Sequence, residues 1–289
     1  MPKDYCQISI DREHEAYLQY YFPEIKRGPF LPLAGTSLWK EDTLPKWEER
    51  PYDVVFTGNY TPLSKFEPTI ERHGKEYADF YYGIIEDFKK HPHLGMDIGI
   101  REHLLSEVED ITEDGVKEMM PNMIMIDLYV RNYFRGKVVQ TLVDAGVSVH
   151  CFGAGWEFLP CEHPENLIKE GGVDSLACLQ ALSKAKVSLN VMPWFKDGAH
   201  DRVFNSMLNG AVCFTDWSRY LAENLRDGED IFFYELDALE CLPDMVQGIL
   251  ENRKKWEHMQ KAAYETAEKS HTWEHRAGAV HKEILSKIR

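Results

Sequence analysis

The stretch KVSLNVMPWFKDGAHDRVFNSMLNGAVCFTD, from Lys186 to Asp216, decides the fold. Two apolar runs, VSLNVM and AVCFTD, flank a polar segment that contains a glycine turn and a short amphipathic helix from about Arg202 to Asn209. The order strand, loop, helix, strand predicts an α/β unit. Parallel strands open at their carboxyl ends into the crevice where ligands bind, so the polar segment is expected at a binding edge.

Four residues of this loop are therefore candidate site residues: Asp197, Gly198, His200 and Arg202. The helix that follows them begins at the same edge, and a helix N-terminus attracts anions through its unpaired N–H groups and its dipole. The predicted ligand is an anion, and a phosphate fits this chemistry.

Asp197 and Asn205 are eight residues apart and bracket the loop and the first helical turn. We expect one of them to contact a sugar hydroxyl and the other a ribose, while Arg202 and the backbone amides hold phosphate. The competing interpretation is an ordinary capped helix with Asp197 or Asp201 at its N-cap and an apolar face of Val203, Phe204 and Met207.

The chain has 289 residues, of which 44% are hydrophobic. This composition is typical of a globular protein with one or two domains. A net charge of −15 argues against nucleic acid or an anionic membrane as a partner, so an anion site must be a local positive island. The six cysteines include no CxxC pair, which favours a cytoplasmic protein. We expect neither a signal sequence nor a membrane span.

Short apolar runs alternate with helical patterns from residue 52 onward, which predicts a Rossmann-like, doubly wound parallel sheet. The predicted strands are 52–58, 147–153, 187–192, 211–216 and 230–236. A helical insertion is expected at about 66–118 after the first strand, and a helical tail from residue 239 to the C-terminus.

The first residues differ from the rest of the chain. CQISI is a candidate strand and HEAYLQYYF a short helix, and a proline-rich connection follows them. We place a boundary near residue 50. Residues 1–50 are then a remnant or linker of an N-terminal domain, and residues 51–289 are the ligand-binding domain.

Two glycine-ended strands offer further candidates. FTGN places Gly58 and Asn59 at the end of the first strand, where a residue without a Cβ lets a phosphate approach. FGAGW supplies Gly153 and Gly155 but lacks the third glycine of a dinucleotide fingerprint. Trp156 is predicted either to stack on a sugar or base, or to pack in the core.

Arg131 and Arg135 lie four residues apart, so a helix places them on one face, where an anion would relieve their repulsion. A surface salt bridge between Arg131 and Asp127 is the alternative. HTWEH, from His271 to His275, lacks the glutamate and third ligand of a zinc helix, so we predict no metal there.

Together, these motifs resemble the donor-binding half of GT-B glycosyltransferases, especially the spore-maturation type. The resemblance rests on YDVVFTGNY, VHCFGAGW, the Lys186 to Asp216 stretch, YLAENLRDGEDIFFYEL and SHTWEHR, and it covers roughly residues 50–289. In similar enzymes a Glu-x7-Glu pair brackets the loop, and Asp197 and Asn205 stand at the matching positions.

The resemblance implies a nucleotide-diphosphate sugar as donor, an unknown acceptor, no obligatory metal or other cofactor, and Asp197, His200 and Arg202 as the catalytic group. Only about 50 residues precede the donor-type domain, so a partner domain or a homo-oligomer is expected to complete the enzyme. The alternatives are a non-catalytic nucleotide-sugar-binding protein and a nucleotide-dependent oxidoreductase.

Overall fold

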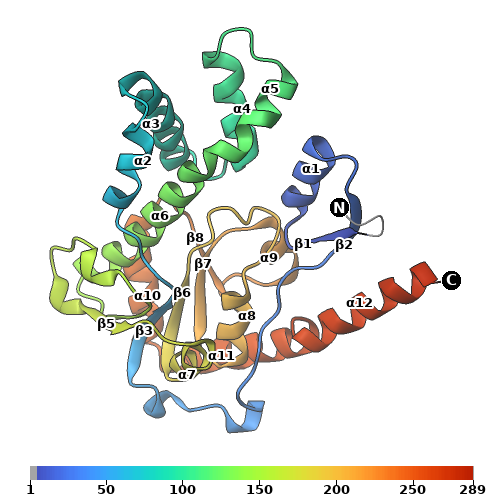
Figure 1. The fold of residues 1–289 in the computed structure, drawn as a ribbon. Coiled ribbons are helices and arrows are strands. Elements are labelled where there is room, and N and C mark those ends of the chain that lie inside the picture. The colour runs from blue at the N-terminus through green and yellow to red at the C-terminus, as the bar shows by residue number, and fades with distance from the viewer. Residues whose placement is uncertain (1–4, 289) are drawn as a thin grey trace.

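A computed structural model describes residues 5–288 and is built around one parallel sheet of six strands (Figure 1). The strand order is β5-β4-β3-β6-β7-β8, and every neighbouring pair is parallel. In chain order this is the 3-2-1-4-5-6 arrangement of a doubly wound fold, with its switch point between β3 and β6. The strands are β3 (Tyr52–Thr57), β4 (Val149–Phe152), β5 (Leu167–Gly171), β6 (Ala185–Asn190), β7 (Val212–Asp216) and β8 (Phe232–Tyr234).

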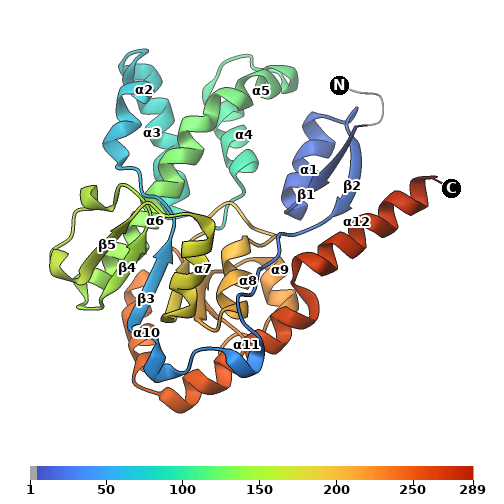
Figure 2. The ribbon, with the colours of Figure 1, turned by 60° about the horizontal axis from the view of Figure 1, so that its bottom comes forward.

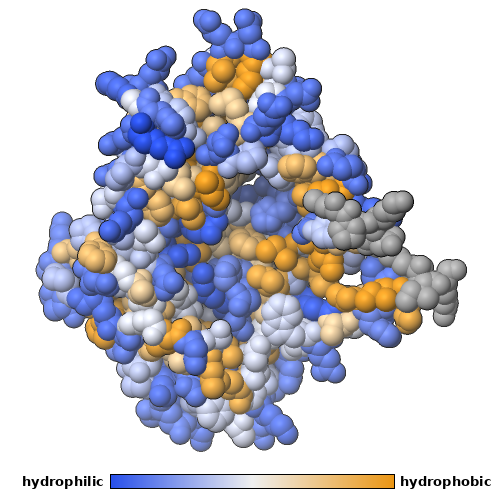
Figure 3. Space-filling view, viewed as in Figure 1, coloured by the Kyte–Doolittle hydropathy of each residue, from blue (hydrophilic) through white to orange (hydrophobic). Residues whose placement is uncertain are grey.

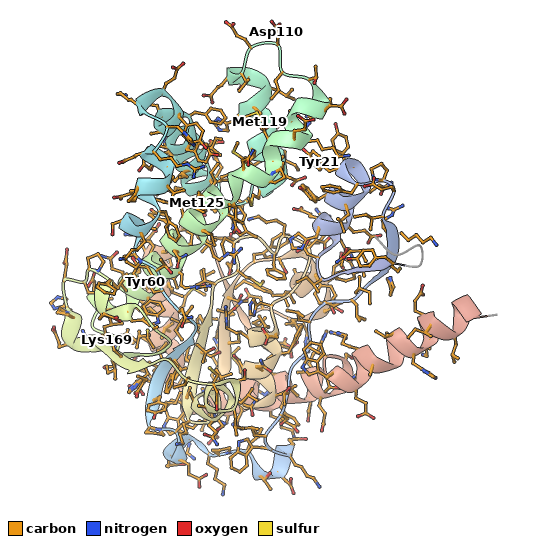
Figure 4. The ribbon with its side chains drawn as sticks, in the orientation of Figure 1. Tyr21, Tyr60, Asp110, Met119, Met125 and Lys169 are labelled. Atoms are coloured by element: carbon orange, nitrogen blue, oxygen red, sulfur yellow. The ribbon has the colours of Figure 1, made fainter. Side chains whose placement is uncertain are left out.

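All five predicted strands are confirmed, while β5 is a strand that the sequence did not predict. It lies at the edge of the sheet, and only Leu167 of its five residues is buried. Its Lys169, labelled in Figure 4, is exposed. A strand with one buried residue carries neither an apolar run nor an alternating pattern, so periodicity does not reveal it.

Helices cover both faces of the sheet. On one face α6 (Ile124–Asp144) and α10 (Leu242–Leu250) contact β4 and β6. On the other, α7 (Ser175–Ser183), α8 (Asp201–Leu208) and α11 (Arg253–Ser270) contact β3, β6 and β7 (Figure 2). Alternate residues of β3 serve the two sides, because Val54 and Phe56 belong to the core around α6 whereas Val55 packs with α7.

The predicted helical insertion is confirmed and rises above the carboxyl edge of the sheet at the top of Figure 1. Its helices are α2 (Glu67–Glu71), α3 (Lys75–Lys90), α4 (Met96–Glu107) and α5 (Glu113–Met119). The helical tail is also confirmed: α12 (Trp273–Ile288) follows α10 and α11 and projects from the body of the molecule (Figure 2). Each described helix is too short or too polar to span a lipid bilayer.

The N-terminal segment forms a second, two-stranded parallel sheet from β1 (Cys6–Ser9) and β2 (Lys26–Phe30), joined by α1 (Arg12–Tyr21). This confirms the predicted strand and helix. Tyr21 is buried, and in Figure 4 it is labelled with Met119 where α1 faces α5. The following chain crosses α8. There the side-chain amide of Asn209 donates to the carbonyl of Thr36 and accepts from the backbone N–H of Leu38. Helix α1 therefore stands beside the insertion, above the same edge of the sheet.

Candidate functional site

A cavity of about 620 Å³ opens at the carboxyl edge of the sheet, beneath the insertion and α1. Figure 3 shows the surface hollowed below the insertion, with hydrophilic and hydrophobic residues at the rim. Its walls come from the loop after β6, the beginning of α8, one side of α6, and residues of α1 and α4. This is the crevice that the strand order predicts for a ligand.

Three arginines line one end of this cavity. Arg131 and Arg135 project from α6 and Arg202 from the first turn of α8, so residues about 70 positions apart in the chain converge. Arg202 donates from Nη1 to the side-chain oxygen of the buried Asn190 at the end of β6, 2.9 Å away. The predicted positive island is present in an otherwise acidic chain.

Arg135 is the most constrained of the three. Burial, together with the charges of Arg202 and Arg131, lowers the pKa of Arg135 to about 9. Its Nη1 donates to the carbonyl of Asn59, while its Nε is buried and has no hydrogen-bond partner among the described residues. A buried donor in a cluster of like charges is stabilised by a bound anion, since one acceptor satisfies the donor and offsets the repulsion.

Arg131 differs because a carboxylate already holds it. Both oxygens of Asp127 accept from Arg131 Nη2, at 2.5 and 2.8 Å. The salt bridge that competed with the anion site is therefore present, although Arg131 also lines the cavity. Of the two α6 arginines, Arg135 is the one with a buried donor that has no partner among the described residues.

His200 lies at the N-cap of α8 and lines the cavity; the predicted caps, Asp197 and Asp201, were wrong. Its Nδ1 is 2.6 Å from Oδ1 of Asp201 and 3.3 Å from the backbone nitrogen of Arg202. A ring proton on Nδ1 lets His200 donate to Asp201 and leaves Nε2 as an acceptor, whereas the contact with the Arg202 N–H requires Nδ1 as an acceptor. Burial lowers the pKa of His200, so the ring is neutral at pH 7.

Asp197 and Asn205 do not line the cavity. The carboxylate of Asp197 is buried and paired with Arg12 at 2.9 Å and Arg219 at 3.4 Å. Asn205 accepts from the backbone of Thr36 at 2.8 Å and donates to Asp201 at 3.1 Å. Both bracket the loop as expected, yet each is engaged in holding the N-terminal segment or α8.

The glycines at the end of β4 and after β6 make close contacts between loops. A Cβ on Gly153 would lie 2.2 Å from the carbonyl oxygen of Gly58, and one on Gly155 would lie 1.9 Å from that of Tyr60. Gly198 likewise meets the backbone of the N-terminal segment, since its Cβ would lie 2.5 Å from the carbonyl oxygen of Ile10. The missing side chains make room for protein backbone.

Asn59 and Trp156 complete this junction. The side-chain oxygen of Asn59 accepts from the backbone N–H of Ala154 at 2.9 Å. Trp156 is fully buried, donates from its ring nitrogen to Gly58 at 2.9 Å and stacks on Tyr60, which is labelled in Figure 4. The predicted stacking of Trp156 on a ligand is wrong, and the core interpretation is right. Gly58 lies beside the arginines, with Arg202 Nη2 3.7 Å from its Cβ position.

The histidines of HTWEH do not converge on a common point. His271 is buried and stacks on Phe204 with ring centroids 4.3 Å apart. His275 is exposed and its Nδ1 lies 2.7 Å from the hydroxyl of Thr272. This motif fixes the junction of α11 and α12 against α8.

Four further residues at the site were not predicted from the sequence. Lys196, Glu13 and Asp97 line the cavity, and Asp216 lies behind it at the end of β7, accepting from the backbone N–H of Met192 at 2.8 Å. Burial raises the pKa of Asp216 to about 6, against the opposing effect of Lys196 and Arg202. Asp216 could have been predicted from its place in the sequence, because it ends a predicted strand at the binding edge.

Replacing Asp216 by asparagine is expected to stabilise the fold at neutral pH. The pKa of Asp216 is about 6 in the folded state and 3.8 as its reference value, so stability is lost as the pH rises from about 4 to 6. The variant keeps the acceptor oxygen without the charge, and its gain should be roughly 2–3 kcal/mol above pH 6.5. Urea unfolding from pH 4.5 to 7.5 measures the free energy of unfolding, and the variant Asp114→Asn at an exposed position is the control. An equal gain in stability at pH 4.5 and pH 7.5 would contradict the raised pKa of Asp216.

Two solved structures match this chain at low sequence identity. Anabaena Alr3699/HepE in complex with UDP-glucose superposes with a TM-score of 0.50 at 9% identity, covering 96% of this chain and 63% of that one. Sucrose-phosphate synthase from Thermosynechococcus elongatus gives 0.48 at 12% identity, covering 98% and 59%. The chain thus spans about three fifths of the length of these proteins. A search of curated proteins gives no match.

The sequence model of the glycosyl transferase-like family matches residues 135–282, just over half of the chain. The matched region begins at Arg135, includes β4, the loop after β6, α8 and β7, and ends within α12 of the tail. It confirms the predicted resemblance to GT-B glycosyltransferases. The chain therefore belongs to the glycosyl transferase-like family.

Proposed function

We propose that this protein transfers a sugar from a nucleoside diphosphate sugar to an acceptor and that the arginine end of the cavity binds the diphosphate. The observation that carries the proposal is the buried, unpaired Nε of Arg135 beside Arg202, at the switch point of the sheet. Fixed donors of this kind have the strongest effect where negative charge develops, as it does on a leaving diphosphate.

The reaction breaks the bond between the sugar's anomeric carbon and the phosphate oxygen, and the bonding electrons remain on the diphosphate. Arg135 and Arg202 stabilise that charge. The acceptor's oxygen or nitrogen forms the new bond to the anomeric carbon, and its proton passes to the departing diphosphate. We propose that His200 exchanges a proton near the leaving group, because its neutral ring lines the cavity. The Nδ1 atom of this ring faces Asp201. Asp197 acts as a positioning residue, since Arg12 and Arg219 hold its carboxylate.

Uridine diphosphate is the nucleotide we propose first. The Anabaena protein is described with UDP-glucose, and the pneumococcal O-GlcNAc transferase GtfA with UDP and GlcNAc. The guanidinium groups of Arg135 and Arg202 supply the positive charge that a divalent cation supplies in other transferases, so the proposed mechanism needs no metal. We also retain the spore-maturation type as the proposed subfamily.

The proposal divides the chain into a donor-binding unit, residues 51–289, and an N-terminal segment, residues 1–50. In the proteins that superpose on it, this chain accounts for about three fifths of the length. Here α1 and the insertion stand above the arginines, and both contribute to the cavity wall. We propose that α1 and the insertion form the wall of the cavity that faces the donor-binding unit. A partner domain or a second copy of the chain would add to this wall.

Isothermal titration of the purified chain with UDP, GDP, ADP, CMP and NAD tests the proposal. We expect one nucleoside diphosphate to bind with a micromolar Kd, equally well with and without EDTA. Binding of NAD alone would support the oxidoreductase alternative, and no binding of any nucleotide would overturn the proposed donor site. Incubation with the matching nucleotide sugar then distinguishes a transferase or hydrolase from a protein that only binds.

A further inference from the structure

The cavity has a second end whose chemistry is opposite to that of the arginines. Glu13 of α1 and Asp97 of α4 line it, and their carboxylates approach one point, 3.3 and 3.5 Å from the position of a Cβ on Gly95. The charges that act on Glu13 are those of Asp11, Lys196, Asp97 and Arg219. Those that shift the pKa of Arg135 are Arg202 and Arg131, so different charged groups act at the two ends.

Neither carboxylate has an ion-pair partner within 4 Å among residues 5–288. Asp97 accepts from the backbone N–H groups of Ile98 and of Asp97 itself at the start of α4, whereas no hydrogen bond from the described part of the chain reaches the carboxylate of Glu13. Burial is the largest cause that raises the pKa of both groups. Lys196 and Arg219 act on Glu13 from beyond ion-pair distance, so the two half-buried carboxylates still favour a ligand that donates hydrogen bonds or carries positive charge over an anion.

The wall between the two ends is apolar. It is formed by side chains of α1, α4, the turn before α6, the first residue of α6 and the loop after β6, namely Tyr17, Met96, Met120, Ile124, Trp194 and Phe195. Such a wall suits an apolar or aromatic body, because contact with it removes hydrocarbon surface from water. The cavity is therefore cationic at one end, apolar along its side and acidic at the other end.

We propose that the Glu13 and Asp97 end is the acceptor subsite, and that the acceptor is a neutral or amine-bearing molecule with an apolar body. This inference rests on the proposed function. An acceptor hydroxyl or ammonium group lies against the carboxylates, its body lies on the apolar wall, and the diphosphate lies at the arginines. Anionic acceptors are excluded from this end by charge.

A matched ligand series tests the charge preference. Phenethylamine, 2-phenylethanol and phenylacetate share one aromatic body and differ in the charge of the terminal group. Ligand-observed NMR titrations, with and without saturating UDP, should show phenethylamine binding at least 10-fold more tightly than phenylacetate. The Glu13→Gln, Asp97→Asn double variant should reduce that ratio to less than 3-fold. Equal binding of amine and carboxylate to the unmodified protein would overturn the proposal.

The net charge of −15 requires a matched control, because any acidic protein attracts amines. The double variant Glu15→Gln, Glu102→Gln removes the same charge from α1 and α4 at positions that do not line the cavity. We expect it to keep the preference for phenethylamine. A preference lost in both double variants would assign the effect to general charge and reject the subsite.

The donor sugar is the other hydroxyl-rich group that the carboxylates could hold, and titration with UDP and UDP-glucose separates the two. In the Glu13→Gln, Asp97→Asn variant both affinities should stay within 2-fold of the unmodified protein. Weaker binding of UDP-glucose with unchanged binding of UDP would place the donor sugar at this end and overturn the acceptor assignment. Failure of UDP to bind the unmodified protein would count against the proposed function, while the amine series still tests the acidic end.

Discussion

Arg135→Ala is expected to weaken binding of the nucleoside diphosphate by about 100-fold, or about 3 kcal/mol. The variant loses the buried Nε donor that has no partner in the described residues and one of three charges that face the cavity. Charge-assisted hydrogen bonds to phosphate in a partly buried site are each worth about 1.5–3 kcal/mol. Isothermal titration with the nucleotide that binds the unmodified protein measures the loss.

The same variant should be at least as stable as the unmodified protein when no ligand is present. Burial and the neighbouring Arg202 and Arg131 lower the pKa of Arg135 to about 9, which means that its charge is unfavourable in the free protein. The lost bond to the Asn59 carbonyl offsets part of the gain. A lower affinity for the nucleoside diphosphate together with an unchanged or higher Tm would show that Arg135 serves binding and not stability. A Tm several degrees lower would instead identify Arg135 as a structural residue.

Two further variants separate charge from geometry. Arg135→Lys keeps the charge without the Nε donor, so it should recover only part of the affinity. Arg253→Ala removes the same charge from the exposed start of α11, where Arg253 pairs with Glu48 and Glu257, and should leave the affinity unchanged. If Arg253→Ala weakens binding as much as Arg135→Ala, long-range charge and not a local site would explain the effect.

The order of strands and helices was predictable because buried parallel strands are apolar throughout. The runs that became β3, β6 and β7 have four to five buried residues each, and such runs are visible without any knowledge of tertiary contacts. The edge strand β5 lacked this signal. Arg131 and Arg135 were predictable for a related reason, because a spacing of four places two side chains on one helix face.

The parts of the site that the sequence did not reveal depend on contacts between distant segments. Glu13 and Asp97 are 84 residues apart and meet only because α1 and α4 both stand above the sheet edge. Asp197 has the position and chemistry of a ligand contact, yet the folded chain brings Arg12 and Arg219 to its carboxylate. Local pattern identifies residue types suited to a task, whereas tertiary contacts decide which of them remain available.

The strand-end glycines illustrate the same limit and lead to the largest expected loss of stability. The glycines of FGAGW suggested room for a phosphate, but the backbone after β3 occupies the positions that their Cβ atoms would take. Gly58 donates its N–H to the Phe152 carbonyl at 2.8 Å, and Tyr60 to the Ala154 carbonyl at 2.9 Å. The two loops thus form a short backbone ladder that extends the sheet beyond β3 and β4.

Gly155→Ala is expected to destabilise the fold by about 4 kcal/mol. Gly155 has a φ of 92°, which strains any L side chain by about 1–2 kcal/mol. Its Cβ would also lie 1.9 Å from the carbonyl oxygen of Tyr60, so the backbone must move. That movement breaks the Tyr60–Ala154 hydrogen bond and disturbs the stack of Trp156 on Tyr60.

Gly146→Ala is the matched control for this prediction. Gly146 has a φ of 87°, and nothing lies within 4 Å of its Cβ position, so the variant carries the backbone strain without the overlap. We expect a loss of only about 1 kcal/mol for Gly146→Ala in urea unfolding at pH 7. The difference between the two variants measures the contact between the loops, because the strain is common to both. Equal losses would mean that the loop after β3 yields freely, and a phosphate contact at these glycines would again be open to test.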